Sequence, residues 1–405
     1  MPRRAVRGVR IGRARLLMSG IHAVVVLDAA TRSDRSRDTF TRLADSLLSL
    51  DPALQAGERV ARDGVELGFA TPADSPLVSH LVETGEPGSV LLYLGDGRVG
   101  ESALREIADS GDYATLTGFF TLIHVRRQRR DGSTRAPLCT LVRDRSGSFT
   151  MVYRVIDDML CVAPRVAALH LAPPSLDELD PLGLGFLLSS GYIPGAATQF
   201  GSIRSVEAGT ALGVAANGTL STSRYWRYPP TLKGARAEHA TGTLDRAVTA
   251  FEASVAANYD DPRRTVVFLS GGVDSRAIAV ACAARAERAD DVHTVSWGER
   301  EDIAGSDAFV AREIARRLGT RHEFLPKRCT DYGGDFGTAC RLTDWLSDVP
   351  YKQPVEWRLM DTLASSGFRA CLRGDQVFTG ERAVHGVEDA RSIATLYRLG
   401  HQGLA

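Results

Sequence analysis

The chain has 405 residues, 44% of them hydrophobic, which is enough apolar content for two cores and predicts two or three domains. Lys plus Arg and Asp plus Glu both number 49, so no global field favours nucleic acid or a membrane surface as a partner. Six scattered cysteines without a C-x-x-C pair argue against zinc and favour a cytoplasmic protein, and no apolar run of about eighteen residues predicts a membrane span.

The first strand is predicted in the segment MSGIHAVVVLDA, which begins at Met18. Residues 1–17 contain six arginines and no acid, and we interpret them as a basic extension or an upstream start outside the fold. The sequence leaves open whether the protein starts at Met1 or at Met18.

The segment that follows is predicted to be rich in antiparallel sheet. Apolar residues alternate over 149–162, as they do in strands with one buried face. The run RRQRR at 126–130 lies between two predicted strands, and we interpret it as a solvated hairpin tip and not as a nucleic-acid site.

A domain boundary is predicted near two consecutive prolines, Pro229 and Pro230, which bar regular structure. A helix is expected after them, from about Leu244 to Asn258. We therefore predict one domain at 18–230 and a second at 231–405.

The second domain is predicted to begin its sheet with a strand, a glycine turn and a helix. In VVFLSGGVDSRAIAVA, residues 266–281, the apolar start predicts a buried parallel strand, and apolar residues recur at helical spacing from Ala277 onward. The backbone N–H groups of such a turn and of the first helical turn converge on one point and form a nest for an anion.

An acid in this turn indicates a cation. The chain contains no Gly-x-x-x-x-Gly-Lys-Ser/Thr string, so the turn is not a Walker loop. Asp274 would repel a bare phosphate, and its presence is explained if a divalent cation lies between the two. The motif therefore predicts Mg²⁺ with a polyphosphate. The alternative is a structural turn in which Asp274 or Ser275 caps the helix.

The rest of this domain alternates strand and helix, which predicts a doubly wound parallel sheet. Thr294–Trp297 and Ala370–Leu372 are expected to be further strands. Ligands of such sheets lie beyond the carboxyl ends of the strands, which is where Ser270, Ser296 and Asp375 fall.

Three segments resemble one known family. SGGVDS, residues 270–275, looks like the pyrophosphate loop of the ATP pyrophosphatases. HTVSWGEREDIAGSDAFVAREIARRLGTRHEFLP, residues 293–326, is similar to the second strand, acid-containing loop and helix of the asparagine synthetase branch. GFRACLRGDQVFTG, residues 367–380, resembles that family's third phosphate-contacting loop, with a shorter glycine run and with Gln376 where the family usually has Glu. The resemblance implies an α/β fold with an adenine nucleotide α-hydrolase-like second domain.

The resemblance also implies a site for ATP and Mg²⁺. Its nucleotide-binding residues would be Leu269, Ser270, Gly271, Gly272, Asp274, Ser275, Val295, Ser296, Gly374 and Asp375. Ser270, Gly272 and Ser275 would hold pyrophosphate. Asp274 and Asp375 would hold the metal, with their carboxylates within roughly 10 Å of each other. Val295 and Ser296 would flank the adenosine. The general base is not identified.

The first domain resembles the glutaminase-like, Ntn-type α+β domain of the same family in the order of its strands and in an Ile-Pro-Gly bridge. Ser19 occupies the place of the family's nucleophilic cysteine and, as a hydroxyl, would need an activating base. The strings Arg-Gly-Pro-Asp and Asn-Gly-Glu-Ile-Tyr-Asn, with which the family holds glutamine, do not occur. We therefore expect an inactive glutaminase, in which Arg143 and Asp144 are a structural pair in a β-hairpin.

The function implied is that of an ATP-dependent ligase that adenylates an aspartate-type carboxylate, releases pyrophosphate and forms an amide with ammonia or a substrate amine. One alternative is a lactam- or peptide-cyclising relative, similar to β-lactam synthetase and lasso-peptide cyclase, which has no need of a glutaminase. Another is a catalytically silent ATP-binding homologue, favoured because the chain ends at Ala405, before the family's helical C-terminal segment. The expected partner is a small-molecule or peptide carboxylate, not nucleic acid or a membrane, and a homodimer is left open.

Overall fold

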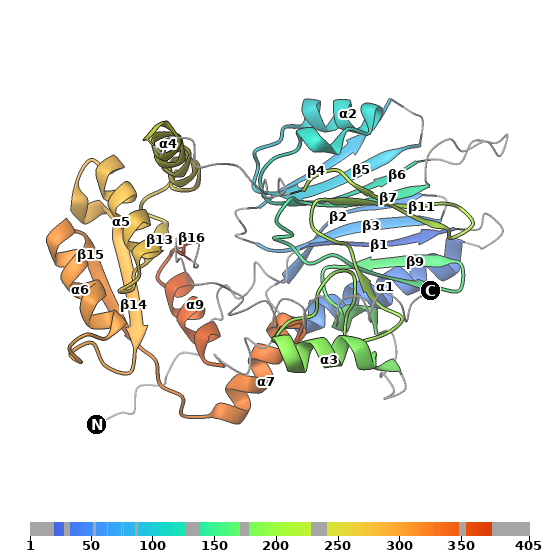
Figure 1. Cartoon of the computed structure of the whole chain (residues 1–405). Helices are drawn as coiled ribbons and strands as arrows, with labels where there is room; N and C mark the ends of the chain where they lie inside the picture. Colours follow the sequence, from blue (N-terminus) through green and yellow to red (C-terminus); the bar gives the residue numbers. More distant parts are fainter. Residues whose placement is uncertain are drawn as a thin grey trace, which may run out of the picture. The chain divides into compact units, whose positions relative to one another are not determined.

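The chain divides into two compact units (Figure 1). Unit 1 comprises Met1–Pro230 and Asp331–Trp357, and unit 2 comprises Thr231–Thr330 and Arg358–Ala405. The structure, a computed structural model, describes residues 20–27, 33–51, 54–62, 64–73, 75, 77–85, 88–126, 138–170, 178–227, 241–347 and 354–374. Unit 1 thus includes a segment, Asp331–Trp357, from within the predicted second domain.

Unit 1 contains two six-stranded antiparallel sheets, with strand orders β10-β8-β9-β1-β3-β2 and β12-β11-β7-β6-β5-β4. The strands of the first sheet are β1 (Gly20–Val26), β2 (Leu54–Arg62), β3 (Val65–Pro72), β8 (Val152–Ile156), β9 (Met159–Ala163) and β10 (Arg204–Ser205). The strands of the second are β4 (Val78–Glu83), β5 (Val90–Gly95), β6 (Phe120–Val125), β7 (Cys139–Arg143), β11 (Thr210–Val214) and β12 (Leu220–Arg224). The helices are α1 (Ser33–Leu50), α2 (Glu101–Ser110), α3 (Pro181–Ser190) and α7 (Tyr332–Thr343).

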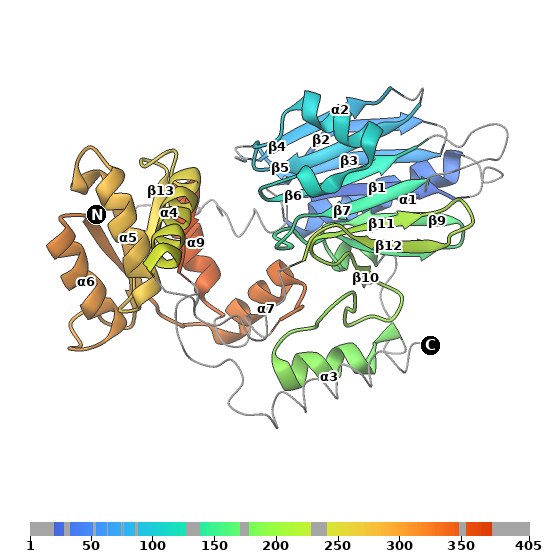
Figure 2. The ribbon, with the colours of Figure 1, turned by 45° about the horizontal axis from the view of Figure 1, so that its top comes forward.

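The two sheets of unit 1 pack face to face. Side chains alternate along each strand, so that each sheet turns one apolar face to the other sheet and the opposite face to a helix. Val25 of β1 and Leu92 of β5 belong to the same buried core between the sheets. Val24, on the opposite face of β1, packs instead with Leu43 of α1. Helix α2 covers the outer face of the second sheet in the same way. The layer order of unit 1 is therefore helix, sheet, sheet, helix, as Figures 1 and 2 show.

The segment Asp331–Trp357 is anchored in unit 1 by a buried ion pair. Arg165 Nε lies 2.8 Å from Asp344 Oδ2, and the two side chains are 2% and 4% exposed. The Asp344 carboxylate also accepts hydrogen bonds from the backbone N–H groups of Val166 (2.7 Å) and Ala167 (3.3 Å). The carboxylate thus has both an opposite charge beside it and hydrogen-bond donors, which offset the cost of burying it.

Apolar and backbone contacts reinforce this anchor. Leu342 and Leu346 pack against the core that lies beneath α1. The N–H group of Ile193 donates to the carbonyl oxygen of Leu346 at 3.3 Å, and Tyr192 forms an antiparallel bridge with Ser347. The segment is therefore an integral part of unit 1.

Unit 2 is built on a four-stranded parallel sheet with the order β15-β14-β13-β16. Its strands are β13 (Thr265–Phe268), β14 (His293–Gly298), β15 (Arg321–Pro326) and β16 (Ala370–Leu372), and its helices are α4 (Thr241–Asn258), α5 (Val273–Arg285), α6 (Asp307–Leu318) and α9 (Glu356–Ser365). Helix α4, expected from about Leu244, begins at Thr241.

Helices cover both faces of this sheet. Val267 and Leu269 pack with α4, α5 and α6 on one face, whereas Val266 and Phe268 pack with α9 on the other. Figures 1 and 2 show α9 across the sheet from α5 and α6. The predicted α/β class is confirmed, with a sheet-rich first region and a doubly wound parallel sheet after it. Among the described residues, no helix has the length and apolar character needed to cross a membrane.

We expect Asp344→Ala to lower the free energy of unfolding of unit 1 by about 3–5 kcal/mol, because it leaves the buried Arg165 guanidinium without a counter-charge. Urea denaturation followed by circular dichroism would measure the loss. Asp344→Asn is the matched control: Asn tolerates the left-handed backbone at this position (φ 54°) and keeps one acceptor oxygen, so its loss should be smaller. A loss under about 1 kcal/mol for Asp344→Ala would show that the pair does not anchor the segment.

Candidate functional site

Three strands of unit 2 end at the same edge of the sheet. β13 pairs with β14 through Phe268 and Val295, and with β16 through Val267 and Leu372. The residues that follow β13 and β16 therefore lie beside the end of β14. The strand order also reverses at β13, since the chain adds β14 on one side of it and β16 on the other. Doubly wound sheets bind ligands at this kind of position.

The turn after β13 is held by its own serine side chains and by one acid. Ser275 Oγ accepts a hydrogen bond from Ser270 N–H at 3.1 Å and lies 3.0 Å from Ser270 Oγ. Ser270 Oγ accepts in turn from Gly272 N–H at 3.1 Å. Gly271 N–H donates to Asp307 Oδ1, also at 3.1 Å. These bonds fix the shape of the turn.

Helix α5 begins directly after the turn without a side-chain cap. Gly272 is the N-cap residue, with φ −72° and ψ 158°, and has no side chain that could accept a hydrogen bond. The alternative in which Asp274 or Ser275 caps α5 is therefore wrong. Both lie within the first turn of the helix and are buried, 7% and 3% exposed. The start of α5 thus offers backbone N–H groups and the positive end of the helix dipole to an anion.

Gly374 brings the chain that follows β16 against this helix end. A Cβ atom on Gly374 would lie 2.6 Å from Ser275 N and 2.7 Å from Asp274 Cβ, so a residue with a side chain would clash there. The third predicted loop therefore meets the first one. Asp375, the second predicted metal ligand, lies outside the described residues.

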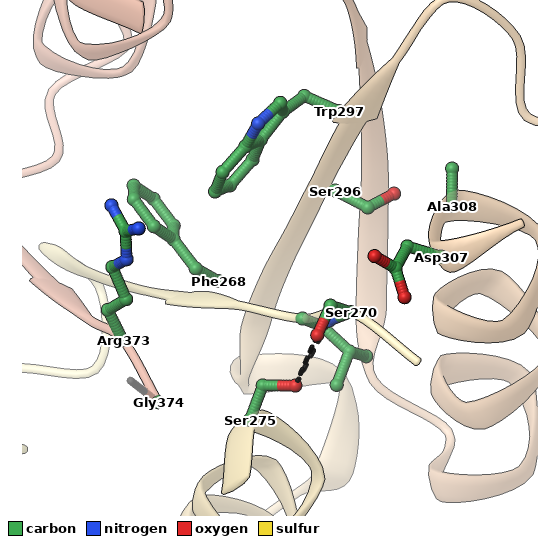
Figure 3. A pocket seen from close by; sticks show the side chains of 10 residues that line it. Phe268, Ser270, Ser275, Ser296, Trp297, Asp307, Ala308, Arg373 and Gly374 are labelled. Carbon is green, nitrogen blue, oxygen red and sulfur yellow. Dashed lines mark hydrogen bonds between the residues drawn. The ribbon is translucent and has the colours of Figure 1, made fainter. Parts of the chain in front are cut away.

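A pocket of about 190 Å³ opens at this edge of the sheet (Figure 3). It is lined by Phe268, Leu269, Ser270, Ser275, Ser296, Trp297, Asp307, Ala308, Arg373 and Gly374. Figure 3 shows Asp307 beside the serine-rich turn, and Arg373 on the other side, near Phe268. Phe268 and Trp297 contact edge to face, with ring centroids 4.8 Å apart. The pocket joins a polar, acid-bearing wall to an aromatic and cationic one.

Most of the predicted site residues are gathered here. Leu269, Ser270, Ser275, Ser296 and Gly374 line the pocket, and Gly271, Gly272 and Asp274 belong to the adjoining turn and first helical turn. Val295 is placed differently: its side chain is 2% exposed and packs in the core between the sheet and α9. Its carbonyl oxygen accepts a hydrogen bond from Leu269 N–H at 2.8 Å, so Val295 supports the site through its backbone.

Sequence reasoning missed Phe268, Trp297, Asp307, Ala308 and Arg373 as pocket residues. Trp297 is an aromatic residue at the end of a predicted strand, which is a signal that could have been used. Asp307 lies in the acid-containing loop, but its contact with Gly271 joins residues 36 apart in sequence, and no local pattern indicates it.

A histidine behind the pocket fixes the proton of the Ser296 hydroxyl. Thr294 Oγ1 donates to the carbonyl oxygen of Arg321 at 3.1 Å, and it lies 2.9 Å from Nδ1 of His322. Ser296 Oγ lies 3.1 Å from Nε2 of the same ring. For a neutral histidine, one assignment alone puts a hydrogen in all three contacts: Nδ1–H donates to Thr294, and Ser296 donates to Nε2.

The histidine is neutral near pH 7 because burial holds the pKa of His322 below its ordinary value. The hydroxyl proton of Ser296 is then directed at His322. The Ser296 oxygen can accept a hydrogen bond from a ligand but has no proton left to donate. A hydroxyl or amine of a ligand therefore suits this wall of the pocket better than a phosphate oxygen.

The residues at this edge fit a pyrophosphate that carries Mg²⁺. Gly272 and Gly374 leave room at positions where a side chain would meet Ser270 Oγ at 3.3 Å or the backbone of α5. The uncapped start of α5 suits phosphate oxygens, and the Asp274 carboxylate suits a hard cation. Within the described part of the chain, no group of three or more His, Cys, Asp or Glu could hold a metal ion. Mg²⁺ held at Asp274 would also take ligands from phosphate and water, as it usually does.

In unit 1, the predicted nucleophile position, Ser19, lies outside the described residues. Arg143 donates to the carbonyl oxygens of Val206 (2.8 Å) and Gly147 (2.6 Å). The buried Asp144 carboxylate accepts from the N–H groups of Ser146 and Ser148, both at 2.9 Å. Both side chains hold the turn after β7, which supports a structural role for them.

Residues 247–392 match the family model described as asparagine synthase. The resemblance to this family predicted from the sequence is therefore confirmed over this segment. The family is one of ATP-dependent ligases. A search of curated protein sequences gives no match.

Two solved structures are similar to the chain at low identity. One is glutamine phosphoribosylpyrophosphate amidotransferase from B. subtilis complexed with ADP and GMP, with 11% identity, a TM-score of 0.33, and coverage of 75% of this chain and 65% of that one. The other is described as the allosteric regulatory enzyme of purine biosynthesis, with 12% identity, a TM-score of 0.26, and coverage of 83% and 75%. The chain thus spans less than two thirds of the first structure, and TM-scores this low add nothing to the fold described above.

We expect Gly374→Ala to disrupt the site, because the added Cβ would push the chain after β16 away from the first turn of α5. The free energy of unfolding of unit 2 should fall by about 1–3 kcal/mol, as in other overpacking substitutions. Gly242→Ala in α4 is the matched control, since nothing lies within 4 Å of its Cβ position. Urea denaturation of the two variants would test this, and equal stability would contradict the close approach.

Proposed function

We propose that this chain is an asparagine-synthetase-like ligase that binds ATP with Mg²⁺ at the carboxyl edge of the second sheet. It adenylates an aspartate-type carboxylate, releases pyrophosphate, and forms an amide with ammonia or a substrate amine. The proposal rests on one observation above all: the glycine turn after β13 leads without a side-chain cap into a helix whose first turn carries Asp274, and Gly374 after β16 meets that first turn. The match of residues 247–392 to the asparagine synthase family supports it independently.

The residues of the site suit the steps of such a reaction. Ser270, Gly272 and Ser275 would hold the pyrophosphate through N–H and hydroxyl groups, and the positive end of α5 would stabilise its charge. Asp274 would hold Mg²⁺, which when bound neutralises charge on the leaving pyrophosphate. Ser296 would accept a hydrogen bond from a hydroxyl or amine of the nucleoside. Arg373 would add positive charge at the other wall of the pocket.

A second candidate is a lactam- or peptide-cyclising ligase, in which the amine belongs to the substrate itself. Ser19 favours this candidate, because a serine stands where the family's glutaminase has its nucleophilic cysteine. The chemistry at the ATP site is the same in both candidates, so the source of nitrogen distinguishes them. A silent ATP-binding homologue would bind nucleotide without releasing pyrophosphate in the presence of any amine.

We expect Asp274→Ala to weaken Mg²⁺-dependent ATP binding by at least about tenfold, because a cation between protein and phosphate loses one carboxylate ligand. Isothermal titration calorimetry with ATP and Mg²⁺ would measure this. Asp290→Ala is the control: Asp290 is an acid of the same unit that pairs with Arg288 at the surface. Unchanged binding by Asp274→Ala would show that the site has been assigned wrongly.

We also expect no glutamine hydrolysis above background, since a serine replaces the thiol and the glutamine-holding strings are missing. Glutamate release from glutamine would be assayed with the unaltered protein and with Ser19→Ala. Release that vanishes in Ser19→Ala would overturn this expectation and restore glutamine as the source of nitrogen.

A further inference from the structure

The nest for an anion already holds one negative charge. Asp307 is the first residue of α6, and its Oδ1 accepts the hydrogen bond of Gly271 N–H at 3.1 Å. Figure 3 shows its carboxylate turned toward the turn that carries Ser270. The same carboxylate lines the pocket in which a polyphosphate would lie.

This acceptor differs from the others in the turn. The N–H groups of Ser270 and Gly272 donate to the neutral hydroxyl oxygens of Ser275 and Ser270. Only the N–H of Gly271, among these three, donates to an ionisable group. A phosphate that approaches the turn therefore meets neutral oxygens at two positions and a carboxylate at the third.

The carboxylate is kept in place by the start of its own helix. Ser306 caps α6 by accepting from Phe309 N–H at 3.2 Å, which leaves Asp307 in the first turn, where the helix dipole favours a negative charge. The close fit to the turn is direct, since a Cβ atom on Gly271 would lie 2.9 Å from Asp307 Oδ1. Asp307 is nevertheless exposed, so its side chain has room to turn when a ligand arrives.

We propose that Asp307 makes nucleotide binding at this site depend on a divalent cation. The Asp307 carboxylate accepts from Gly271 N–H and repels a bare polyphosphate. A cation that arrives with the nucleotide offsets this repulsion, and the carboxylate then no longer opposes binding. Asp307 is thus a positioning and selecting residue that favours metal-bound nucleotide over free nucleotide. This inference rests on the proposed function of the pocket as an ATP site.

The hydrogen bond and the charge of Asp307 can be separated by substitution. Asp307→Asn keeps an oxygen that can accept from Gly271 N–H but removes the charge. Asp307→Ala removes both. Asp302→Asn makes the same change of charge in the loop before α6, at an acid that pairs with Arg300 and has a side chain 60% exposed. It serves as the matched control.

The test is isothermal titration of the full chain with ATP, once with excess Mg²⁺ and once with EDTA. We expect Asp307→Asn to bind metal-free ATP about tenfold more tightly than the unaltered protein, because one like charge near the phosphates has been removed. Its affinity for ATP with Mg²⁺ should change by less than about threefold. Asp302→Asn should match the unaltered protein under both conditions.

Two results would overturn the inference while leaving the proposed function intact. One is equal metal-free affinity of Asp307→Asn and the unaltered protein, while both bind ATP with Mg²⁺. The other is a gain in metal-free affinity in Asp307→Ala but not in Asp307→Asn, which would assign the effect to the hydrogen bond and not to the charge. Failure of the unaltered protein to bind ATP even with Mg²⁺ would overturn the proposed site and this inference together.

Discussion

The parallel pairing of β13 on both of its edges is the constraint on which the candidate site depends. Hydrogen bonds to β14 on one side and to β16 on the other align three strand ends that are distant in sequence. This alignment lets a glycine after β16 touch the first turn of the helix after β13. Without the pairing to β16, nothing would hold Gly374 against this helix start.

Electrostatics then distinguishes the two walls of the pocket. The start of α5 and Arg373 contribute positive potential, while Asp274 in the first turn of α5 and Asp307 at the start of α6 contribute negative charge beside the same glycine turn. Such a mixture suits a ligand that brings both signs of charge, as a metal-bound polyphosphate does. The histidine behind Ser296 adds a further preference, because it leaves that hydroxyl as an acceptor. The position of this hydroxyl proton, as well as the charges, therefore bears on which ligand groups suit the pocket.

Local sequence patterns predicted those structural features that depend on residues close together in the chain. The glycine turn, the strands on either side of it and the parallel sheet of unit 2 follow from short apolar runs and helical spacing. The capping alternative failed because Gly272, one position before the helix, satisfies the geometry of an N-cap without a side chain. Two contacts could not be predicted from the sequence, because they depend on packing between segments that are distant in the chain. These are the pairing of Gly271 with Asp307 and the burial of Asp344 against Arg165, 179 residues apart.

The position of Asp331–Trp357 in unit 1 has a consequence for the order in which the protein can fold during synthesis. Arg165 leaves the ribosome long before its buried partner Asp344, so this ion pair cannot form until residue 344 has been made. The sheet of unit 2 also forms late, because one edge of β13 has no partner strand until β16 has been made. Each unit is completed by residues that are translated after the other has begun to fold. Asp344 and β16 are translated within a few seconds of each other at ordinary rates of translation, roughly 5–20 residues per second.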